Sequence, residues 1–231
     1  MAEIKITQDQ DQDQDPNADP CQDRRFRGRP QVRPDCDTRQ VIYEAARHEF
    51  SDNGYAATSI ERVARRAGVS TKTLYRLIPN KAALFEGMVS DRIDRFLSGI
   101  DLEAIDHSEI EEALYAALMA CADLALDKDV VALQSMVLQE AGKFSDLAGT
   151  FYRNGIQRTV TALADWLTMQ QKRGLIELDD AQEVAGMLLG MVADAPRRAT
   201  MFGGLPLPSR PQIEARVRKC VGVFLRGYRA M

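Results

Sequence analysis

The chain has 231 residues, of which 45% are hydrophobic, 28% charged and 6% aromatic, and its net charge is −4 at pH 7. This length is enough for one large or two small domains with a buried core, and the composition is that of an ordinary soluble protein. No apolar signal segment opens the chain, and its longest apolar run, Val184 to Ala193, is too short to span a bilayer. Few segments alternate polar and apolar residues, so we expect an all-α protein of the cytoplasm.

Charge is distributed unevenly along the chain. Residues 1–23 contain one lysine and seven acidic residues. Residues 24–81 contain thirteen Lys or Arg and six acidic residues, and residues 82–231 contain sixteen Lys or Arg and twenty-one acidic residues. The three net charges are therefore −6, +7 and −5. A basic segment within an otherwise acidic chain is typical of a surface that binds phosphate, so residues 24–81 are expected to contact nucleic acid.

Residues 1–37 are expected to form an acidic tail followed by a basic arm. The first twenty residues are mostly Asp, Gln, Pro and Asn, a composition that buries too little apolar surface to fold. Residues 24–33 contain five arginines and no helical periodicity. If residues 24–81 bind DNA, such an arm is suited to the minor groove, and Arg27 and Arg29 are expected to contact DNA there. A solvated linker is the alternative.

Residues 58–81 have the pattern of two short helices joined by a tight turn. Thr58 and Glu61 have the spacing of a capping box, in which each side chain satisfies an amide at the start of a helix. Gly68 is suited to end that helix in the left-handed conformation, and Ser70 to cap the next one. The second helix is expected to present four polar side chains outward: Thr71, Lys72, Tyr75 and Arg76. Periodicity alone fits a plain αα-hairpin equally well, but the basic flanks favour a DNA-reading helix-turn-helix.

The helix-turn-helix domain is expected to span residues 38–88. One helix, from about Thr38 to Asn53, precedes the motif, and Asn53 followed by glycine ends it. Another helix, capped by Asn80, follows the motif and continues to about Gly99. Both have an apolar stripe that can pack against the two motif helices.

Residues 39–88 resemble the DNA-binding domain of the TetR/AcrR family of bacterial repressors. The residues that carry the resemblance, with unbroken spacing, are Ala45-Ala46, Phe50, Gly54-Tyr55, Thr58-Ser59-Ile60, Val63-Ala64, Ala67-Gly68-Val69-Ser70, Thr73-Leu74-Tyr75 and Lys81. The chain departs from the family at Leu77-Ile78, where a His or aromatic residue followed by Phe is usual. Ile78 keeps a buried aliphatic side chain, whereas Leu77 removes a polar group near DNA.

The resemblance implies a DNA-contacting role for seven residues of the motif. Phosphates are expected to be held by Thr58, Tyr75 and Lys81. Base edges of the major groove are expected to lie at or near Ser70, Thr71, Lys72 and Arg76. These roles agree with the chemistry, because Lys or Arg can donate to guanine and the Thr methyl can touch thymine.

Residues 100–231 are expected to form a helical ligand-binding and dimerisation domain. Apolar periodicity predicts helices near 109–127, 130–143, 147–173, 180–200 and 211–229. The resemblance implies that the last two helices pair with their copies in a second subunit. A homodimer would double the reading helix by two-fold symmetry and so match a palindromic operator.

An apolar or amphipathic small molecule is the expected effector of this domain. The candidate ligand-binding residues are Met119, Met136, Trp166, Met169 and Met187. Methionine suits adaptable apolar pockets, although methionines at helical spacing are also ordinary core residues.

We therefore expect a sequence-specific DNA-binding transcriptional regulator, and by resemblance a repressor that a small molecule releases from its operator. The alternatives are a non-specific architectural DNA-binding protein and a ligand-binding protein without a DNA function. An enzyme is not expected, because no GxSxG, Walker, GxGxxG or HExxH pattern occurs. The four cysteines form no CxxC pair, and neither a metal nor a cofactor is expected.

Overall fold

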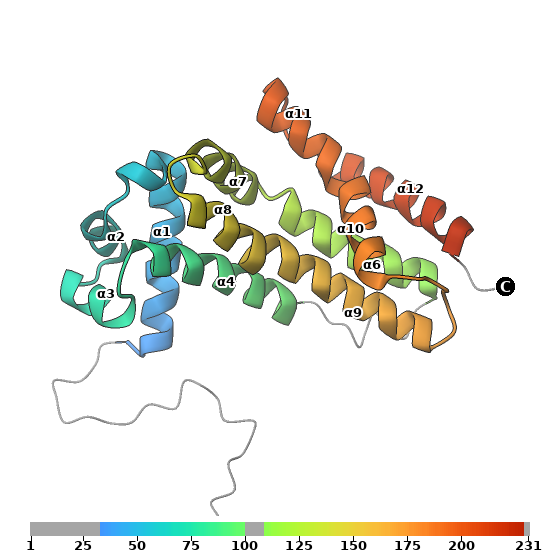
Figure 1. The fold of residues 1–231 in the computed structure, drawn as a ribbon, viewed down its shortest axis with the longest axis horizontal. Helices are drawn as coiled ribbons and strands as arrows, with labels where there is room; N and C mark the ends of the chain where they lie inside the picture. Colours follow the sequence, from blue (N-terminus) through green and yellow to red (C-terminus); the bar gives the residue numbers. More distant parts are fainter. Residues whose placement is uncertain (1–32, 100–108, 229–231) are drawn as a thin grey trace, which may run out of the picture.

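The computed structural model describes residues 33–99 and 109–228. Within these ranges every regular element is helical, which confirms the all-α prediction. Figure 1 shows an elongated arrangement with α1–α4 at one end, α12 toward the other, and α7 and α8 between them. In the same ranges no helix combines the length and the apolar character that crossing a bilayer requires.

The N-terminal helices are α1 (Asp35–Ala57), α2 (Ile60–Ala67), α3 (Thr71–Leu77) and α4 (Lys81–Gly99). The remaining elements are α6 (Ile110–Ala125), α7 (Lys128–Glu140), α8 (Ser145–Phe151), η1 (Tyr152–Gln157), α9 (Arg158–Lys172), α10 (Ala181–Leu189), η2 (Gly190–Asp194), α11 (Ala195–Gly203) and α12 (Arg210–Tyr228). The two elements named η are short π-helices, and each continues the α-helix before it into the one after it. The predicted helices at 147–173 and 180–200 are thus both interrupted by a π-turn.

The first helix was predicted from about Thr38 to Asn53, and its start was placed three residues too late, whereas the predicted end coincides with a break at Gly54. The helix begins at Asp35, and residues in helical conformation continue to Ala57 beyond a break at Gly54. Gly54 has φ 77° and ψ 171°, a conformation open essentially to glycine alone. The chain therefore changes direction at Gly54 and then adds one more short turn.

The turns of the motif follow the predicted chemistry except at its start. Gly68 has φ 67° and ends α2, and the Ser70 hydroxyl accepts the Thr73 amide at 3.0 Å to cap α3. The predicted capping box at Thr58 was wrong, because Ser59 caps α2 and accepts the Arg62 amide. Asn80 caps α4 as expected, through its Oδ1 atom.

Two apolar cores are present, and the first is not confined to the N-terminal helices. It contains Phe50, Leu74 and Phe85, together with Leu133 of α7 and Phe151 of α8. α1 packs directly against α7. Thus α7 and α8 are built into the core of the helix-turn-helix part, although they lie beyond residue 100 in the sequence.

The second core belongs to the C-terminal helices alone. Leu118 of α6, Trp166 of α9, Leu188 of α10 and Phe224 of α12 are buried in it. α9 packs against α10, and α6 packs against α12. The chain passes from one core to the other along α8, η1 and α9, so this segment links the two cores.

Candidate DNA-reading surface and regulatory cavity

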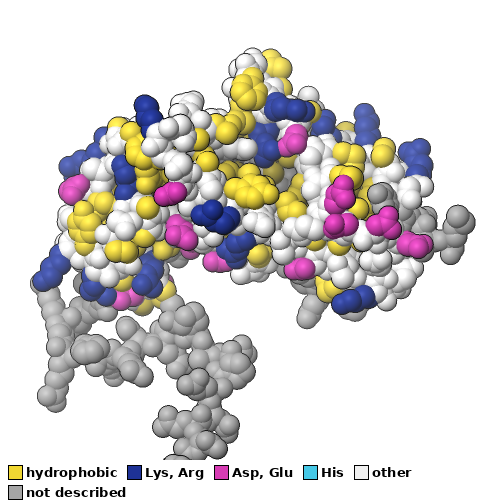
Figure 2. Space-filling view, in the orientation of Figure 1, with side chains coloured by type: hydrophobic (Ala, Val, Ile, Leu, Met, Phe, Trp, Pro, Cys, Tyr) yellow, Lys and Arg dark blue, Asp and Glu magenta, His cyan; other side chains and the backbone are white. Residues whose placement is uncertain are grey.

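α3 presents the polar face expected of a recognition helix. Leu74 is fully buried and holds α3 on the core, so that the opposite side of this short helix faces outward. Ser70 and Lys72 are exposed, Tyr75 is 47% exposed, and Thr71 is partly exposed. Figure 2 shows Lys and Arg side chains gathered around this end of the molecule. With Arg76, which is also exposed, the structure therefore brings five of the seven expected DNA contacts of the motif to one accessible surface.

Arg76 lies at the C-terminal end of the same exposed helix, but its guanidinium already has an acidic partner. Two of its nitrogens donate to the Asp35 carboxylate, each at 2.7 Å. This bidentate ion pair connects the end of α3 to the start of α1. A base contact from Arg76 would therefore have to replace or share that carboxylate.

Thr58 and Lys81, which the resemblance assigns to phosphates, both form hydrogen bonds within the fold. Thr58 is 3% exposed, and its hydroxyl lies 2.9 Å and 2.8 Å from the carbonyl oxygens of Glu49 and Gly54. The Thr58 hydroxyl is therefore buried and donates to the backbone in the DNA-free chain, and its phosphate contact stays a prediction.

The Lys81 ammonium donates three hydrogen bonds to backbone carbonyls. Its acceptors are the oxygens of Tyr55 at 2.9 Å, Ala56 at 3.3 Å and Thr58 at 3.1 Å. The same nitrogen lies 4.7 Å from the centre of the Tyr55 ring. Desolvation by burial lowers the pKa of Lys81, and the nearby Glu140 carboxylate opposes this shift. Lys81 therefore joins the start of α4 to the α1–α2 turn, and its three donors are occupied within the fold.

A buried carboxylate that sequence reasoning missed holds α1 to α2. Glu49 is 4% exposed and pairs with Arg62 at 3.0 Å and Arg66 at 2.9 Å. The Asn53 amide also donates to it at 3.2 Å. The sequence position of Glu49 could have indicated its burial, because Glu49 lies among the apolar residues that form the inner stripe of α1.

A cavity of about 370 Å³ lies between the two cores. Met88, Val89, Leu133 and Phe151 line it from the first core, and Val160 packs against the second. Both π-turns contribute to its wall, and π-turns in helices are frequent at functional sites. Its volume is at the small end of the roughly 300–1,000 Å³ typical of pockets for drug-sized ligands.

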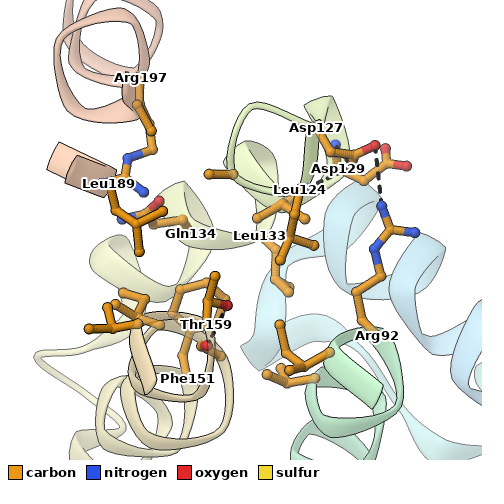
Figure 3. Close-up of a pocket in the computed structure, with 18 of the residues that line it drawn as sticks. Arg92, Leu124, Asp127, Asp129, Leu133, Gln134, Phe151, Thr159, Leu189 and Arg197 are labelled. Atoms are coloured by element: carbon orange, nitrogen blue, oxygen red, sulfur yellow. Dashed lines mark hydrogen bonds and ion pairs between the residues drawn. The ribbon is translucent and has the colours of Figure 1, made fainter. Parts of the chain in front are cut away.

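The polar residues of the cavity wall form ion pairs that connect different helices. Arg47 of α1 pairs with Asp129, and Arg92 of α4 pairs with Asp127 at 3.4 Å. Figure 3 shows the second of these pairs at one side of the cavity. The Asp127 carboxylate also caps α7, accepting the amides of Asp129 and Val130. The start of α7 is thus held to both long helices of the N-terminal part.

None of the five predicted ligand-binding residues lines this cavity. Met119 and Trp166 are buried in the second core and Met136 in the first, whereas Met169 and Met187 are 41% and 52% exposed. The helical spacing of the methionines indicated that one side of each helix is apolar. It did not indicate whether that side lines a cavity, packs in a core or lies on the outer surface. Glycines on facing helices would have been a better signal, since Gly155, Gly186 and Gly190 all line the wall.

The last helices carry an apolar outer surface. Met187 of α10, Phe202 of α11 and Val223 of α12 are exposed, and Phe202 is 79% exposed. α11 contains no buried residue. Exposed apolar side chains on neighbouring elements are typical of a surface that another protein covers.

Two of the predicted DNA contacts, Arg27 and Arg29, lie outside the described residues, as does the acidic tail. Across the parts that are described, no three His, Cys, Asp or Glu side chains are grouped so that they could hold a metal ion.

Two family models match the chain, one for each part. Residues 42–88 match the model of bacterial regulatory proteins of the tetR family. Residues 112–230 match the model of the AefR-like transcriptional repressor C-terminal domain. The first match covers the helix-turn-helix, and the second begins in α6 and includes most of the cavity wall.

Relatives agree with these matches. An uncharacterized HTH-type transcriptional regulator of Mycobacterium bovis is 30% identical over 155 residues, which are 66% of this chain and 77% of the relative. The crystal structure of a TetR-family regulator from Mesorhizobium loti has a TM-score of 0.74 and 26% identity, covering 85% of this chain and 98% of its own. The flavonoid-responsive regulator FrrA has a TM-score of 0.66 and 26% identity, covering 84% of this chain and 98% of its own. The chain therefore belongs to the TetR family, and it is a DNA-binding transcriptional regulator of the helix-turn-helix type.

Proposed function

We propose that this protein is a cytoplasmic repressor that binds a palindromic operator as a homodimer and leaves it when a small molecule fills the cavity. The observation that carries the proposal is the position of the cavity. Its wall includes Arg47 of α1 and Arg92 of α4, so a ligand would touch the helices that support the recognition helix. A ligand can shift a conformational equilibrium only through such differential contacts.

At the DNA end, α3 would read the major groove. Lys72 would donate to base edges, Tyr75 would hold a phosphate, and Ser70 and Thr71 would contact the groove from the start of the helix. Phosphate contacts set the register of the helix on DNA, and base contacts supply the sequence preference. An arm containing Arg27 and Arg29 would add contacts in the adjacent minor groove.

α7 would transmit the presence of ligand to the DNA-reading surface. Its N-terminal end is paired with Arg47 and Arg92 at the cavity, and its C-terminal residue Glu140 reaches the α1–α2 turn. There Glu140 Oε1 lies 3.5 Å from the Ala56 amide and close to the Lys81 ammonium. A shift of α7 would therefore move the turn that precedes α2 and change the spacing of the two reading helices in a dimer.

The apolar surface of α10–α12 would form the homodimer interface. Two copies of α10 to α12 would cover Met187, Phe202 and Val223, which are exposed in the single chain. The same two-fold axis would place two α3 helices on successive major grooves of a palindrome, about one helical turn apart. Repression and response to a small molecule agree with the AefR-like repressor model and with the flavonoid response named for FrrA.

The decisive experiment is selection of operator DNA by the purified full-length protein, beginning with the region upstream of its own gene. We expect a palindromic site that the protein binds at least roughly a thousandfold more tightly than scrambled DNA of equal length, at one salt concentration. A ratio near one would instead support non-specific architectural binding. Release from that site by a compound that fits the cavity would support the regulatory part of the proposal.

A further inference from the structure

The charged groups of the cavity wall balance one another. Three arginines line it, Arg47, Arg92 and Arg197, and three aspartates, Asp127, Asp129 and Asp194. Each arginine forms an ion pair with one of these aspartates. No other Lys, Arg, His, Asp or Glu among the described residues lines the cavity, so its wall carries no net charge.

This balance sets the charge of the molecule that fits. A charged ligand loses its hydration on entering the cavity, and only an uncompensated charge of opposite sign would repay that cost. Here every charged side chain of the wall already has its counter-ion. An uncharged ligand avoids the cost and can still share hydrogen bonds with the paired groups.

The polar groups also lie at two separate sides of the cavity. Figure 3 shows Arg92, Asp127 and Asp129 on one side, Arg197 on the other, and apolar side chains such as Leu133 between them. The wall between the two polar sides is lined mainly by aliphatic residues and Phe151.

Gln134 supplies an uncharged hydrogen-bonding group near Arg197 (Figure 3). Its side-chain amide has no hydrogen bond to another residue in the described part of the chain, and it lines the cavity. An amide can both donate and accept, so it suits a hydroxyl or a carbonyl oxygen equally. A free amide at one side matches a ligand that carries a polar group at that end.

We infer that the cavity takes an uncharged, elongated molecule with an apolar middle and a hydrogen-bonding group at each end. The inference rests on the proposed function, because it names the ligand class of the same cavity. Aromatic molecules with a hydroxyl at both ends belong to this class. A fatty acid or another molecule with an anionic end does not.

Three rigid probes of nearly equal size test the ligand class: 4,4′-dihydroxybiphenyl, 4-phenylphenol and biphenyl-4-carboxylate. With the full-length protein in isothermal titration calorimetry, the diol should bind roughly tenfold more tightly than the monophenol, because it satisfies both sides. The carboxylate should bind more weakly than either phenol. A tighter carboxylate, or no binding by the diol, would overturn the inference.

Variants of the wall make the test specific to this cavity. Gly186 lies in α10 and lines the cavity, and a Cβ atom added there meets no atom within 4 Å, so Gly186→Leu should be accommodated and reduce diol binding at least roughly tenfold. Glu183→Leu, on the same helix and outside the cavity wall, is the matched control and should bind as the native protein does. Unchanged binding in Gly186→Leu would place the probes elsewhere and so contradict the inference.

Two further variants test the charge balance of the wall and its hydrogen-bonding amide separately. Asp194→Asn leaves Arg197 without its counter-ion, and it should tighten binding of the carboxylate relative to the phenols. Gln134→Leu should weaken the diol more than the monophenol. Measuring operator affinity in the presence of the same probes separates the two proposals. A different order of probe affinities contradicts the inferred ligand class. Tight binding of the diol without any change in operator affinity contradicts ligand-responsive repression.

Discussion

Lys72 and Arg76 are the two cations of α3, and their surroundings differ. No hydrogen bond or ion pair joins Lys72 to another residue in the described part of the chain, whereas Arg76 is held by Asp35 through two hydrogen bonds. An unpaired, exposed ammonium is available for a new partner without breaking an existing contact. Among the residues of α3, Lys72 is therefore the better candidate for reading a base.

Lys72→Ala is expected to change the sequence preference of the protein on a randomised operator library. A lost donor to a base should cost about 1–3 kcal/mol at the operator position that it reads and little elsewhere. Tyr75→Phe is the matched comparison, because loss of a phosphate contact weakens all sequences alike. An unchanged preference in the Lys72 variant would contradict its base-reading role.

Cys121 predicts a dependence of stability on alkaline pH. Burial raises the pKa of this thiol from 9.0 to about 12. Above pH 9 the unfolded chain loses the proton while the folded protein keeps it, so stability is full below that pH and falls as the pH rises toward 12.

Chemical denaturation of the native protein and of Cys121→Val measures this effect. Between about pH 8 and about pH 10 the native protein should lose about 1.4 kcal/mol more unfolding free energy than the variant, which has no thiol to titrate. The comparison cancels the titration of other groups. Parallel curves for the two proteins would show that Cys121 is accessible to solvent in the folded state.

At the scale of single elements, the connection between α7 and the helix-turn-helix is the structural feature with the clearest consequence. Glu140 ends α7 beside the α1–α2 turn, and Lys81 holds the same turn through three carbonyl oxygens. The break at Gly54 brings this turn into reach of both side chains, since an added Cβ there would lie 3.5 Å from Glu140 Oε1.

A double-mutant cycle of Lys81→Met and Glu140→Gln should reveal this connection. We expect a coupling energy of about 1 kcal/mol in urea unfolding, because each variant removes one partner of the same electrostatic interaction. Gln139→Ala replaces Glu140→Gln in the control cycle, since Gln139 is the exposed neighbour on α7. Additive effects in the first cycle would mean that Glu140 and Lys81 act independently.

Local sequence was sufficient to predict the helix-turn-helix but not every cap within it. Gly68 and Ser70 act through their own backbone and nearest neighbours, so their roles could be predicted. Thr58 and Ser59 are both capable caps, and tertiary packing decided between them by burying the Thr58 hydroxyl. Apolar periodicity predicted continuous helices across η1 and η2, so the two π-turns became visible only in the structure.

At the scale of the whole molecule, the apolar surface of α10–α12 bears most directly on how the protein assembles. α11 buries no residue within the single chain, and its neighbours expose methionine and valine side chains. A second copy of the chain would remove this surface from water. Operator affinity would then depend on assembly, because each protomer supplies one α3.

Val223→Glu is expected to yield a monomer in analytical ultracentrifugation at micromolar concentration. A charge buried at a subunit interface costs several kcal/mol, which is enough to dissociate a dimer of ordinary affinity. Leu138→Glu is the control, since Leu138 is 55% exposed on α7 and lies outside α10–α12. A Val223 variant that stays dimeric would place the interface on another surface.

The sequence by itself determined the all-α class, the turn of the helix-turn-helix, the polar face of α3 and the membership of the TetR family. These features depend on residues close together in the chain, where spacing and cap chemistry act directly. Only the tertiary structure decided that the Thr58 hydroxyl is buried, that the Lys81 ammonium donates to backbone carbonyls, and that α7 joins the first core. It also decided that glycines and paired charges line the cavity, while the five predicted ligand-binding residues do not. The reason is physical: a cavity wall is formed by helices distant in sequence, and which faces meet there follows from how all of them pack.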